Sequence, residues 1–186
     1  MKIIALGLFL TLSACGYNIG HYNRTLPKGY KTIFIEMFEN RSPEVTSEAH
    51  FTNALIKEFH RSGFVLVRDK SAAEVIVKGT VMSVTSLGRN STVNFRNLAG
   101  NAYDATLFTQ YGVDAVVHLK LLQAIDEKVL WQTTLRSQKN YYAPILTQSG
   151  VRSSNPLYNN SARMRTIASV AQQMMNEAFD RMTENF

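Results

Sequence analysis

The strictest constraint on the fold is a pair of alternating segments in the middle of the chain. From residue 113 to 121 every second residue is apolar, and after the short connection Asp126-Glu127-Lys128 the residues Val129, Trp131, Thr133 and Leu135 again share one face. A period of two places successive side chains on opposite faces of a strand. The chain is therefore predicted to form an antiparallel hairpin with one apolar face, which other elements must cover.

Three further segments have the composition of strands. Residues 31–38, reading KTIFIEMF, form a near-continuous apolar run of the kind found in strands buried on both faces. Residues 64–67 are a short strand candidate, and residues 75–87 are strongly β-branched, which favours a long strand.

Two stretches have no clear period. Between 88 and 111 we expect an excursion in the form of a hairpin, with strands at 91–96 and 105–111, because 24 residues without structure are unusual in a compact domain. Residues 140–155 are polar and carry Tyr141 and Tyr142, and they are predicted to form a loop.

Two segments have the helical period instead. Ser42 can cap a first helix with Pro43 at its first position, and Gly63 is a suitable stop after Ser62. A second helix is expected from Asn155-Pro156 to the C-terminus. The apolar stripe of the first helix consists of Val45, Ala49, Thr52, Leu55, Ile56 and Phe59, with Glu48, Lys57, Glu58 and Arg61 opposite; that of the second consists of Ile167, Val170, Ala171, Met174, Ala178 and Met182.

These elements occur in the order β, α, β, β, β, α. Two amphipathic helices need an apolar surface to cover, and a sheet of about four strands supplies it on one face. We therefore predict an α+β fold, a two-layer sandwich in which two helices pack on a mixed sheet. Residues 31–186 would form this single domain, with 88–111 as its excursion.

The N-terminus carries an export signal. Lys2 is followed by an apolar run of ten residues, which is too short to span a bilayer, where about 20 are needed. Leu12-Ser13-Ala14-Cys15 is a lipobox, so residues 1–14 are predicted to be a lipoprotein signal peptide and Cys15, the only cysteine, to be the lipid attachment site. Residues 15–30 would be the lipidated tether. Gly16, in place of an aspartate that retains lipoproteins in the inner membrane, favours the outer membrane of a Gram-negative bacterium.

The charge of the chain points to anionic partners. Lys and Arg number 20 against 14 Asp and Glu, a net charge of +6, and cleavage before Cys15 leaves 172 residues at +5. A basic balance favours anionic ligands without identifying them. Nucleic acid is disfavoured because the chain is exported.

No residue set indicates catalysis. The motifs G-x-S-x-G, G-x-G-x-x-G and the phosphate-binding loop are absent from the sequence. His50 and His60 are ten residues apart on one helix, unlike the spacing of four that binds zinc, and a single acylated cysteine can serve neither as nucleophile nor in a disulfide. We expect a protein that is not an enzyme and that holds no metal and no cofactor.

Several segments in order resemble the LptE family of lipopolysaccharide-assembly lipoproteins. They are Cys15-Gly16-Tyr17, Leu26-Pro27, IFIEMFENR at 33–41, LIKEF at 55–59, DKSAAEVIVKGTV at 69–81 and DEKVLW at 126–131. The resemblance covers essentially the whole mature chain. The sequence departs from the family in the length of its 88–111 connection and in Glu74, which replaces an aspartate.

This resemblance implies a role without catalysis. LptE-like proteins have two helices on four strands, lie inside the lumen of the large β-barrel LptD as plug and assembly partner, and in some cases bind lipopolysaccharide. The partners implied are an LptD-type barrel, lipopolysaccharide, and the membrane through the lipid anchor.

Basic residues near the predicted strands are the candidates for contact with lipopolysaccharide. Lys and Arg can donate charge-assisted hydrogen bonds to lipid A phosphates and core sugars, and arginine can do so with two bonds at once. The candidates are Arg89, Arg96, Lys120, Arg136 and Lys139. Tyr141 and Tyr142 are candidates for contact with the barrel, since tyrosine is favoured at interfaces.

A second hypothesis is an outer-membrane lipoprotein that activates a peptidoglycan synthase. It shares the lipid anchor and the α+β class, but a tether of fifteen residues from Gly16 to Tyr30, at about 3.5 Å each, spans little of the periplasm. An exported hydrolase is a third possibility, with no motif in its favour.

Overall fold

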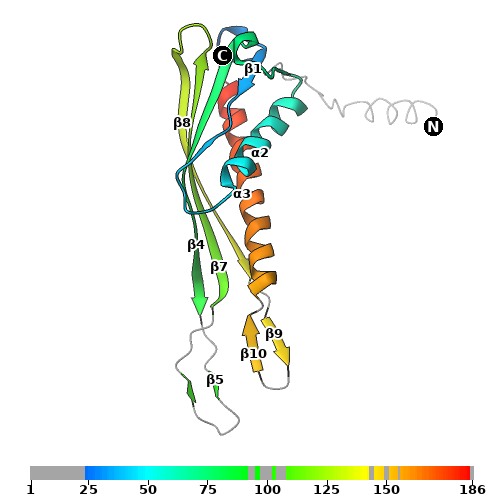
Figure 1. Ribbon diagram of the computed structural model, residues 1–186, viewed down its shortest axis with the longest axis vertical. Helices are drawn as coiled ribbons and strands as arrows, with labels where there is room; N and C mark the ends of the chain where they lie inside the picture. Colours follow the sequence, from blue (N-terminus) through cyan, green and yellow to red (C-terminus); the bar gives the residue numbers. More distant parts are fainter. Residues whose placement is uncertain are drawn as a thin grey trace, which may run out of the picture.

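A computed structural model describes residues 24–91, 95–96, 102–103, 108–142, 145–148, 151–154 and 156–184. Cys15, the predicted signal peptide and most of the predicted tether lie outside these ranges. The chain folds as an elongated α+β structure in which a sheet carries two helices on one side (Figure 1).

The main sheet is mixed and has six strands, in the order β3-β1-β4-β7-β8 with β2 beside β4. The three long strands β4, β7 and β8 pair antiparallel, whereas β1 with β3, β1 with β4 and β2 with β4 are parallel. About four strands were expected, and the sheet is larger because two two-residue segments join it. The strands are β1 (Thr32–Ile35), β2 (Glu39–Asn40), β3 (Val65–Leu66), β4 (Val75–Ser91), β7 (Phe108–Gln123) and β8 (Val129–Tyr142).

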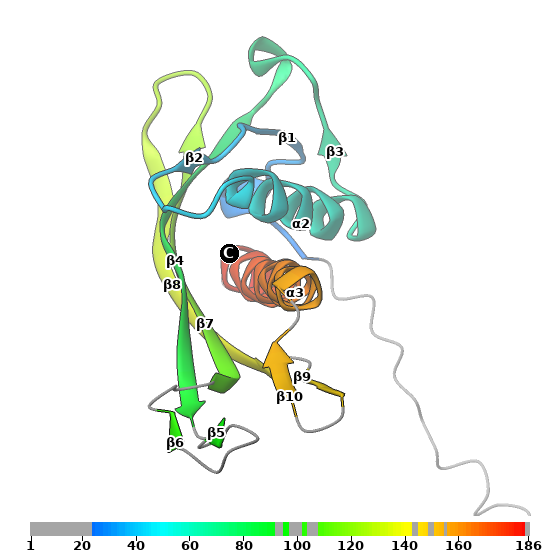
Figure 2. The ribbon, with the colours of Figure 1, turned by 60° about the horizontal axis from the view of Figure 1, so that its bottom comes forward.

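Two helices, α2 (Ser47–Arg61) and α3 (Pro156–Thr183), cover the same face of the sheet (Figure 2). The alternating residues expected to be apolar, among them Val113, Val117, Leu119 and Leu121, are fully or almost fully buried beneath them. The predicted two-layer sandwich is therefore confirmed. Short 3-10 turns at Pro27–Gly29 and Lys70–Ala72 complete this part of the chain.

The end of α2 follows the expected glycine stop. Gly63 has a φ of +79°, and the N–H groups of Gly63 and Phe64 donate to the carbonyls of His60 and Phe59, the Schellman arrangement. The rings of Phe59 and Phe64 pack edge to face, with their centroids 5.5 Å apart. The ring of Phe179 in α3 also packs edge to face on Phe59, with a centroid distance of 4.9 Å. This aromatic cluster joins the two helices at the C-terminal end of each.

The start of α2 was predicted four residues too early. Residues 42–44 form a bend, because the Asn40 side chain accepts from the Ser42 N–H at 2.9 Å and donates to the Glu44 carbonyl at 2.8 Å. Val45 therefore lies outside the helical stripe and is 75% exposed. An asparagine that bonds its neighbours' backbone in this way competes with helix formation.

Glu58 was placed on the solvent side of α2, and this prediction was wrong. Its side chain is buried at the contact with α3, where it accepts hydrogen bonds from Gln172, from Asn176 at 3.3 Å and from Arg61 at 2.6 Å. One residue of the predicted polar side of α2, Glu58, thus lies in the contact between the two helices.

The two segments without a clear period also contain strands. β4 and β7 stay paired as far as Ser91 and Phe108, so much of the 88–111 excursion is an extension of the main ladder, followed by the short pair β5 (Phe95–Arg96) and β6 (Ala102–Tyr103). The predicted loop 140–155 instead holds the end of β8 and the hairpin of β9 (Ile145–Gln148) and β10 (Val151–Ser154). Polar side chains do not prevent pairing on strands that extend beyond the core.

Candidate functional site

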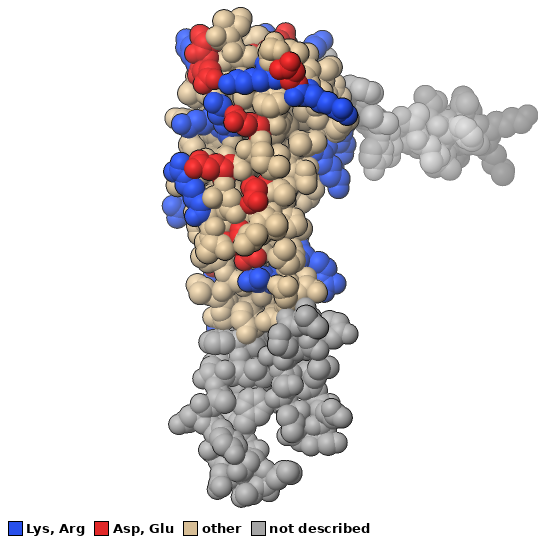
Figure 3. All heavy atoms as spheres, viewed as in Figure 1, with Lys and Arg blue, Asp and Glu red and all other residues tan. Residues whose placement is uncertain are grey.

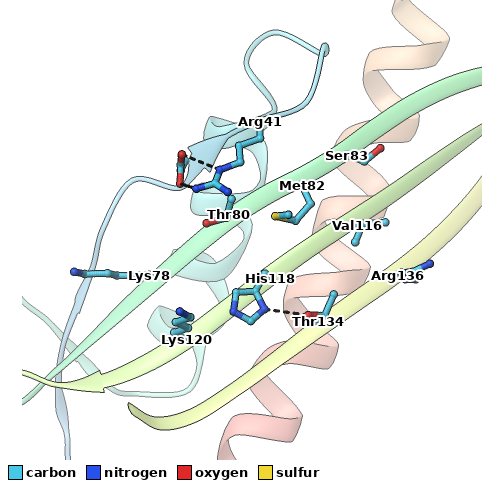
Figure 4. A pocket seen from close by; sticks show the side chains of 11 residues that line it. Arg41, Lys78, Thr80, Met82, Ser83, Val116, His118, Lys120, Thr134 and Arg136 are labelled. Atoms are coloured by element: carbon cyan, nitrogen blue, oxygen red, sulfur yellow. Dashed lines mark hydrogen bonds and ion pairs between the residues drawn. The ribbon is translucent and has the colours of Figure 1, made fainter. Parts of the chain in front are cut away.

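The face of the sheet that turns away from the helices forms a groove with polar and basic walls. Side chains of β4, β7 and β8 that alternate with the buried ones project into it, with α3 behind the sheet (Figure 4). Its volume is about 740 Å³. It is lined by Glu39, Arg41, Lys78, Thr80, Met82, Ser83, Val116, His118, Lys120, Thr134 and Arg136.

A bulge in β4 sets which side chains face the groove. Val81 lies opposite Val117 and Ser83 lies opposite Val116, so Met82 is an extra residue in β4. Val81 and Val84 are both buried as a result, although they are three residues apart. The set of β4 residues that face the helices therefore changes parity in the middle of the strand.

The register brings two lysines face to face. Lys78 of β4 pairs directly with Lys120 of β7, and on the next rows Thr80 pairs with His118 and His118 with Thr134 of β8. Side chains at directly opposite positions have β-carbons about 4.5 to 5.5 Å apart, and like charges there are destabilising. The two lysines thus lie at one end of the groove, and the row Thr80, His118 and Thr134 lies between them and Arg136.

The cations around the groove differ in how far carboxylates offset their charge. Arg41 donates two hydrogen bonds to Glu39, at 2.9 and 3.0 Å, which lowers the pKa of that carboxyl and raises the pKa of Arg41. Lys78 lies 3.4 Å from Glu127 and 3.9 Å from Glu36. Within the described part of the chain, Lys120 and Arg136 form no ion pair.

Glu127 is shared between two lysines. The hydrogen bond from Lys70 at 2.7 Å is the main reason why the pKa of Glu127 lies below its ordinary value, and Lys78 adds to the effect. Lys78 therefore shares Glu127 with Lys70 and also lies near Glu36, so two carboxylates face these two lysines. Among the described residues, the Lys and Arg side chains of the groove that have no carboxylate partner are Lys120 and Arg136.

The five basic residues predicted to contact lipopolysaccharide lie at different places in the structure. Lys120 and Arg136 line the groove, and Arg89 is paired with Asp114 at 2.6 Å on the same face. Lys139 lies on the opposite face, where its ammonium donates to the Ser169 hydroxyl of α3 at 2.7 Å. Arg96 belongs to β5, and its side chain lies outside the described part of the structure.

Arg41 and Lys78 were missed by the sequence reasoning. Lys78 could have been found by pairing the predicted strands 75–87 and 113–121 in register, which places it opposite Lys120. Arg41 follows β2, a two-residue strand that has no signal of its own in the sequence. Of the two tyrosines predicted as contact residues, Tyr142 is 76% exposed and Tyr141 is buried.

Basic side chains also gather elsewhere on the surface. In the space-filling view blue Lys and Arg atoms lie on both margins and across the top, and red Asp and Glu atoms lie among them at the top and down the middle (Figure 3). Across the described ranges no helix is long and apolar enough to cross a bilayer, and no three His, Cys, Asp or Glu side chains are grouped as metal ligands.

The chain resembles several solved structures at low sequence identity. One from Helicobacter pylori, described as a neuraminyllactose-binding hemagglutinin homolog, aligns with a TM-score of 0.50 at 9% identity over 87% of this chain and 89% of that one. A minor lipoprotein from Acinetobacter baumannii aligns with a TM-score of 0.48 at 14% identity over 84% and 94%. The Helicobacter match shows a shared fold.

Comparison at the sequence level gives a family. No curated protein matches the chain. The family model for LptE, described as lipopolysaccharide-assembly, matches residues 30–185. Because this match covers far more than half of the chain, the protein belongs to the LptE lipopolysaccharide-assembly family.

Proposed function

We propose that the protein is a lipid-anchored outer-membrane component of lipopolysaccharide assembly, that it plugs and helps to assemble an LptD-type β-barrel, and that it does so without catalysis. We further propose that the groove on the uncovered sheet face binds phosphate groups of lipopolysaccharide. Family membership supports the first part, and the chemistry of the groove supports the second.

The observation that carries the binding proposal is the cross-strand pair Lys78 and Lys120. Cationic side chains at directly paired strand positions repel each other, and an anion bound beside them offsets that repulsion. A phosphate monoester carries the required charge, and its three oxygens accept hydrogen bonds from several donors at once.

The surrounding side chains suit the same ligand. Arg136 has a planar guanidinium that can bind two phosphate oxygens, and within the described residues no carboxylate pairs with it. Met82 and Val116 give the groove an apolar strip beside its cations. A phosphorylated glycolipid presents both kinds of surface.

The binding proposal is tested with Lys120→Gln/Arg136→Gln, a double variant that removes two charges from the groove. Its control is Lys57→Gln/Arg165→Gln, which removes two charges from exposed positions on the helices. We expect the groove variant to weaken binding of purified lipopolysaccharide about tenfold or more and to reduce its dependence on salt, because each lost charge-assisted hydrogen bond contributes about 1.5 to 3 kcal/mol. Equal binding by the two variants would contradict the proposal.

The assembly role is tested by isolating the tagged protein from detergent-solubilised outer membranes. Recovery of a large β-barrel, identified by mass spectrometry, is the expected result. Recovery of a penicillin-binding protein in its place would favour a regulator of peptidoglycan synthesis and would overturn the assignment to the barrel.

A further inference from the structure

A second cavity lies on the other side of the sheet, near the first turns of α3. Its volume is about 320 Å³, within the usual range of ligand pockets. It shares no lining residue with the basic groove. The cavity is lined by Ser86, Tyr111, Tyr141, Asn159, Asn160 and Arg163.

One wall of this cavity is aromatic. Tyr111 of β7 and Tyr141 of β8 occupy directly paired positions, and their rings stack with centroids 5.5 Å apart and planes 16° from parallel. The hydroxyls of Tyr141 and Ser86 lie 3.3 Å apart. The wall therefore combines π faces, which carry partial negative charge, with hydroxyl groups that donate and accept hydrogen bonds.

The opposite wall holds an unsatisfied acceptor. The side-chain oxygen Oδ1 of Asn159 is buried and has no hydrogen-bond partner among the described residues. Buried polar atoms almost always form a hydrogen bond, and a buried acceptor that forms none destabilises the folded protein. A donor brought in from outside the chain, from water or from a ligand, would satisfy it.

The cavity has little net charge. Arg163 donates to Asn160 Oδ1 at 3.0 Å, and its guanidinium lies 3.4 Å from the Glu44 carboxylate. Arg163, the one charged side chain among the described residues that line the cavity, is thus already paired. An anionic ligand would have to compete with Glu44, so the site favours a neutral one.

We propose that this cavity binds a neutral saccharide unit. A sugar ring presents C–H groups, which are attracted to an aromatic face, and hydroxyls, which can donate to Asn159 and exchange hydrogen bonds with Tyr141 and Ser86. The site is distinct in chemistry and position from the phosphate-binding groove. The saccharide can belong to a membrane glycolipid or to the cell-wall glycan, because the recognised groups are the same.

The test uses the full-length protein in detergent and two neutral probes. One is the neutral hexose part of the lipopolysaccharide core, free of phosphate and of acidic sugars, and the other is a trimer of N-acetylglucosamine. Isothermal titration calorimetry should detect saturable binding of at least one, and the one that binds identifies the source. Asn159→Leu should weaken binding about tenfold or more, and Tyr141→Phe, which removes only a hydroxyl, roughly 2- to 10-fold.

The control is the groove variant Lys120→Gln/Arg136→Gln, which should bind the neutral probes as the unmodified protein does. Failure of this proposal can thus be told apart from failure of the phosphate proposal. Thermal unfolding shows whether each cavity variant remains folded. Binding of neither probe, binding only of a phosphorylated oligosaccharide, or equal binding by the unmodified protein and both folded cavity variants would overturn the saccharide site.

Discussion

The aromatic ring of Phe38 covers Gly79 so closely that a β-carbon at position 79 would lie 2.5 Å from ring atoms Cδ2 and Cε2. Phe38 is itself buried, and its N–H donates to the hydroxyl of Thr52 in α2 at 3.0 Å. Phe38, which follows β1 in the chain, thus contacts both β4 and α2. The glycine is required by this approach of a ring to the sheet.

Gly79→Ala should therefore destabilise the protein. A methyl group cannot fit without moving the ring of Phe38, and overpacking of this kind costs about 1–3 kcal/mol. Urea unfolding followed by circular dichroism measures the change. The control is Thr80→Ala, at the next position and facing the groove, whose free energy of unfolding should stay within about 0.5 kcal/mol of that of the unmodified protein. A Gly79→Ala variant as stable as this control would show that the ring of Phe38 moves freely.

Gln172→Leu should destabilise the contact between the helices. Glu58 is 1% exposed, and the substitution removes one of the three side chains that donate to its carboxylate. Loss of a donor to a buried charged group costs about 1–3 kcal/mol. The exposed neighbour Gln173→Leu is the matched control.

Replacing the carboxylate at the same time separates this explanation from a packing defect. In Glu58→Met/Gln172→Leu no charge is left without its donor, so part of the lost free energy of unfolding should return. Strictly additive effects of the two substitutions would argue against the proposed role of Glu58.

Glu74 should make the stability of the protein depend on pH in the acidic range. Its carboxylate accepts from the N–H groups of Lys31 and Thr32 at 2.8 and 2.9 Å, and the Thr32 hydroxyl, followed by these N–H groups, holds its pKa below the ordinary value. A lowered pKa in the folded state means that the stabilisation is complete above the unfolded value of about 4.3 and is lost as the pH falls through the folded value.

Glu74→Gln should accordingly lower the free energy of unfolding at pH 7, and the difference from the unmodified protein should shrink below about pH 4.3. Chemical unfolding across pH 3 to 7 measures this. Glu184→Gln, at an exposed carboxylate beyond the end of α3, controls for the loss of one negative charge. A difference that stays constant over the whole range would contradict the role of the Glu74 hydrogen bonds.

Cys15→Ala should abolish lipid attachment. The lipobox makes Cys15 the expected site, and several acyl chains together hold a protein stably on a membrane. Cells that express the unmodified protein should incorporate labelled palmitate into it, and the variant should not. Ser13→Ala keeps a small residue in the lipobox and should be labelled normally, whereas palmitate on the Cys15→Ala protein would place the lipid elsewhere.

Local periodicity accounts for the part of the fold that the sequence predicted. The alternation around Val117 and Leu135 identified a hairpin and its buried face, and helical spacing around Val170 and Met174 identified the buried face of α3. Such patterns are visible in one segment at a time, because burial of one face imposes the period of the element itself. The fold class followed from covering those faces.

The errors lie where no segment contains the cause. The burial of Glu58 depends on donors more than a hundred positions away in α3. The bend before α2 is the exception, because Asn40 lies only two and four positions from Ser42 and Glu44, whose backbone it bonds. The bulge at Met82 is defined only by the register of β4 against β7. Strand β2 was missed because its two residues are too few for a period to be recognised, whereas β3 lies within the predicted strand 64–67.

The candidate sites divide in the same way. The sequence by itself determined that the chain is basic, that it carries a lipobox cysteine, and that Lys120 and Arg136 lie on alternating strands. Only the tertiary structure decided that Lys78 faces Lys120 and that Lys139 turns to the helices. The physical reason is that a strand specifies the alternation of its own side chains, while pairing register, bulges and the side on which helices pack decide which distant side chains meet.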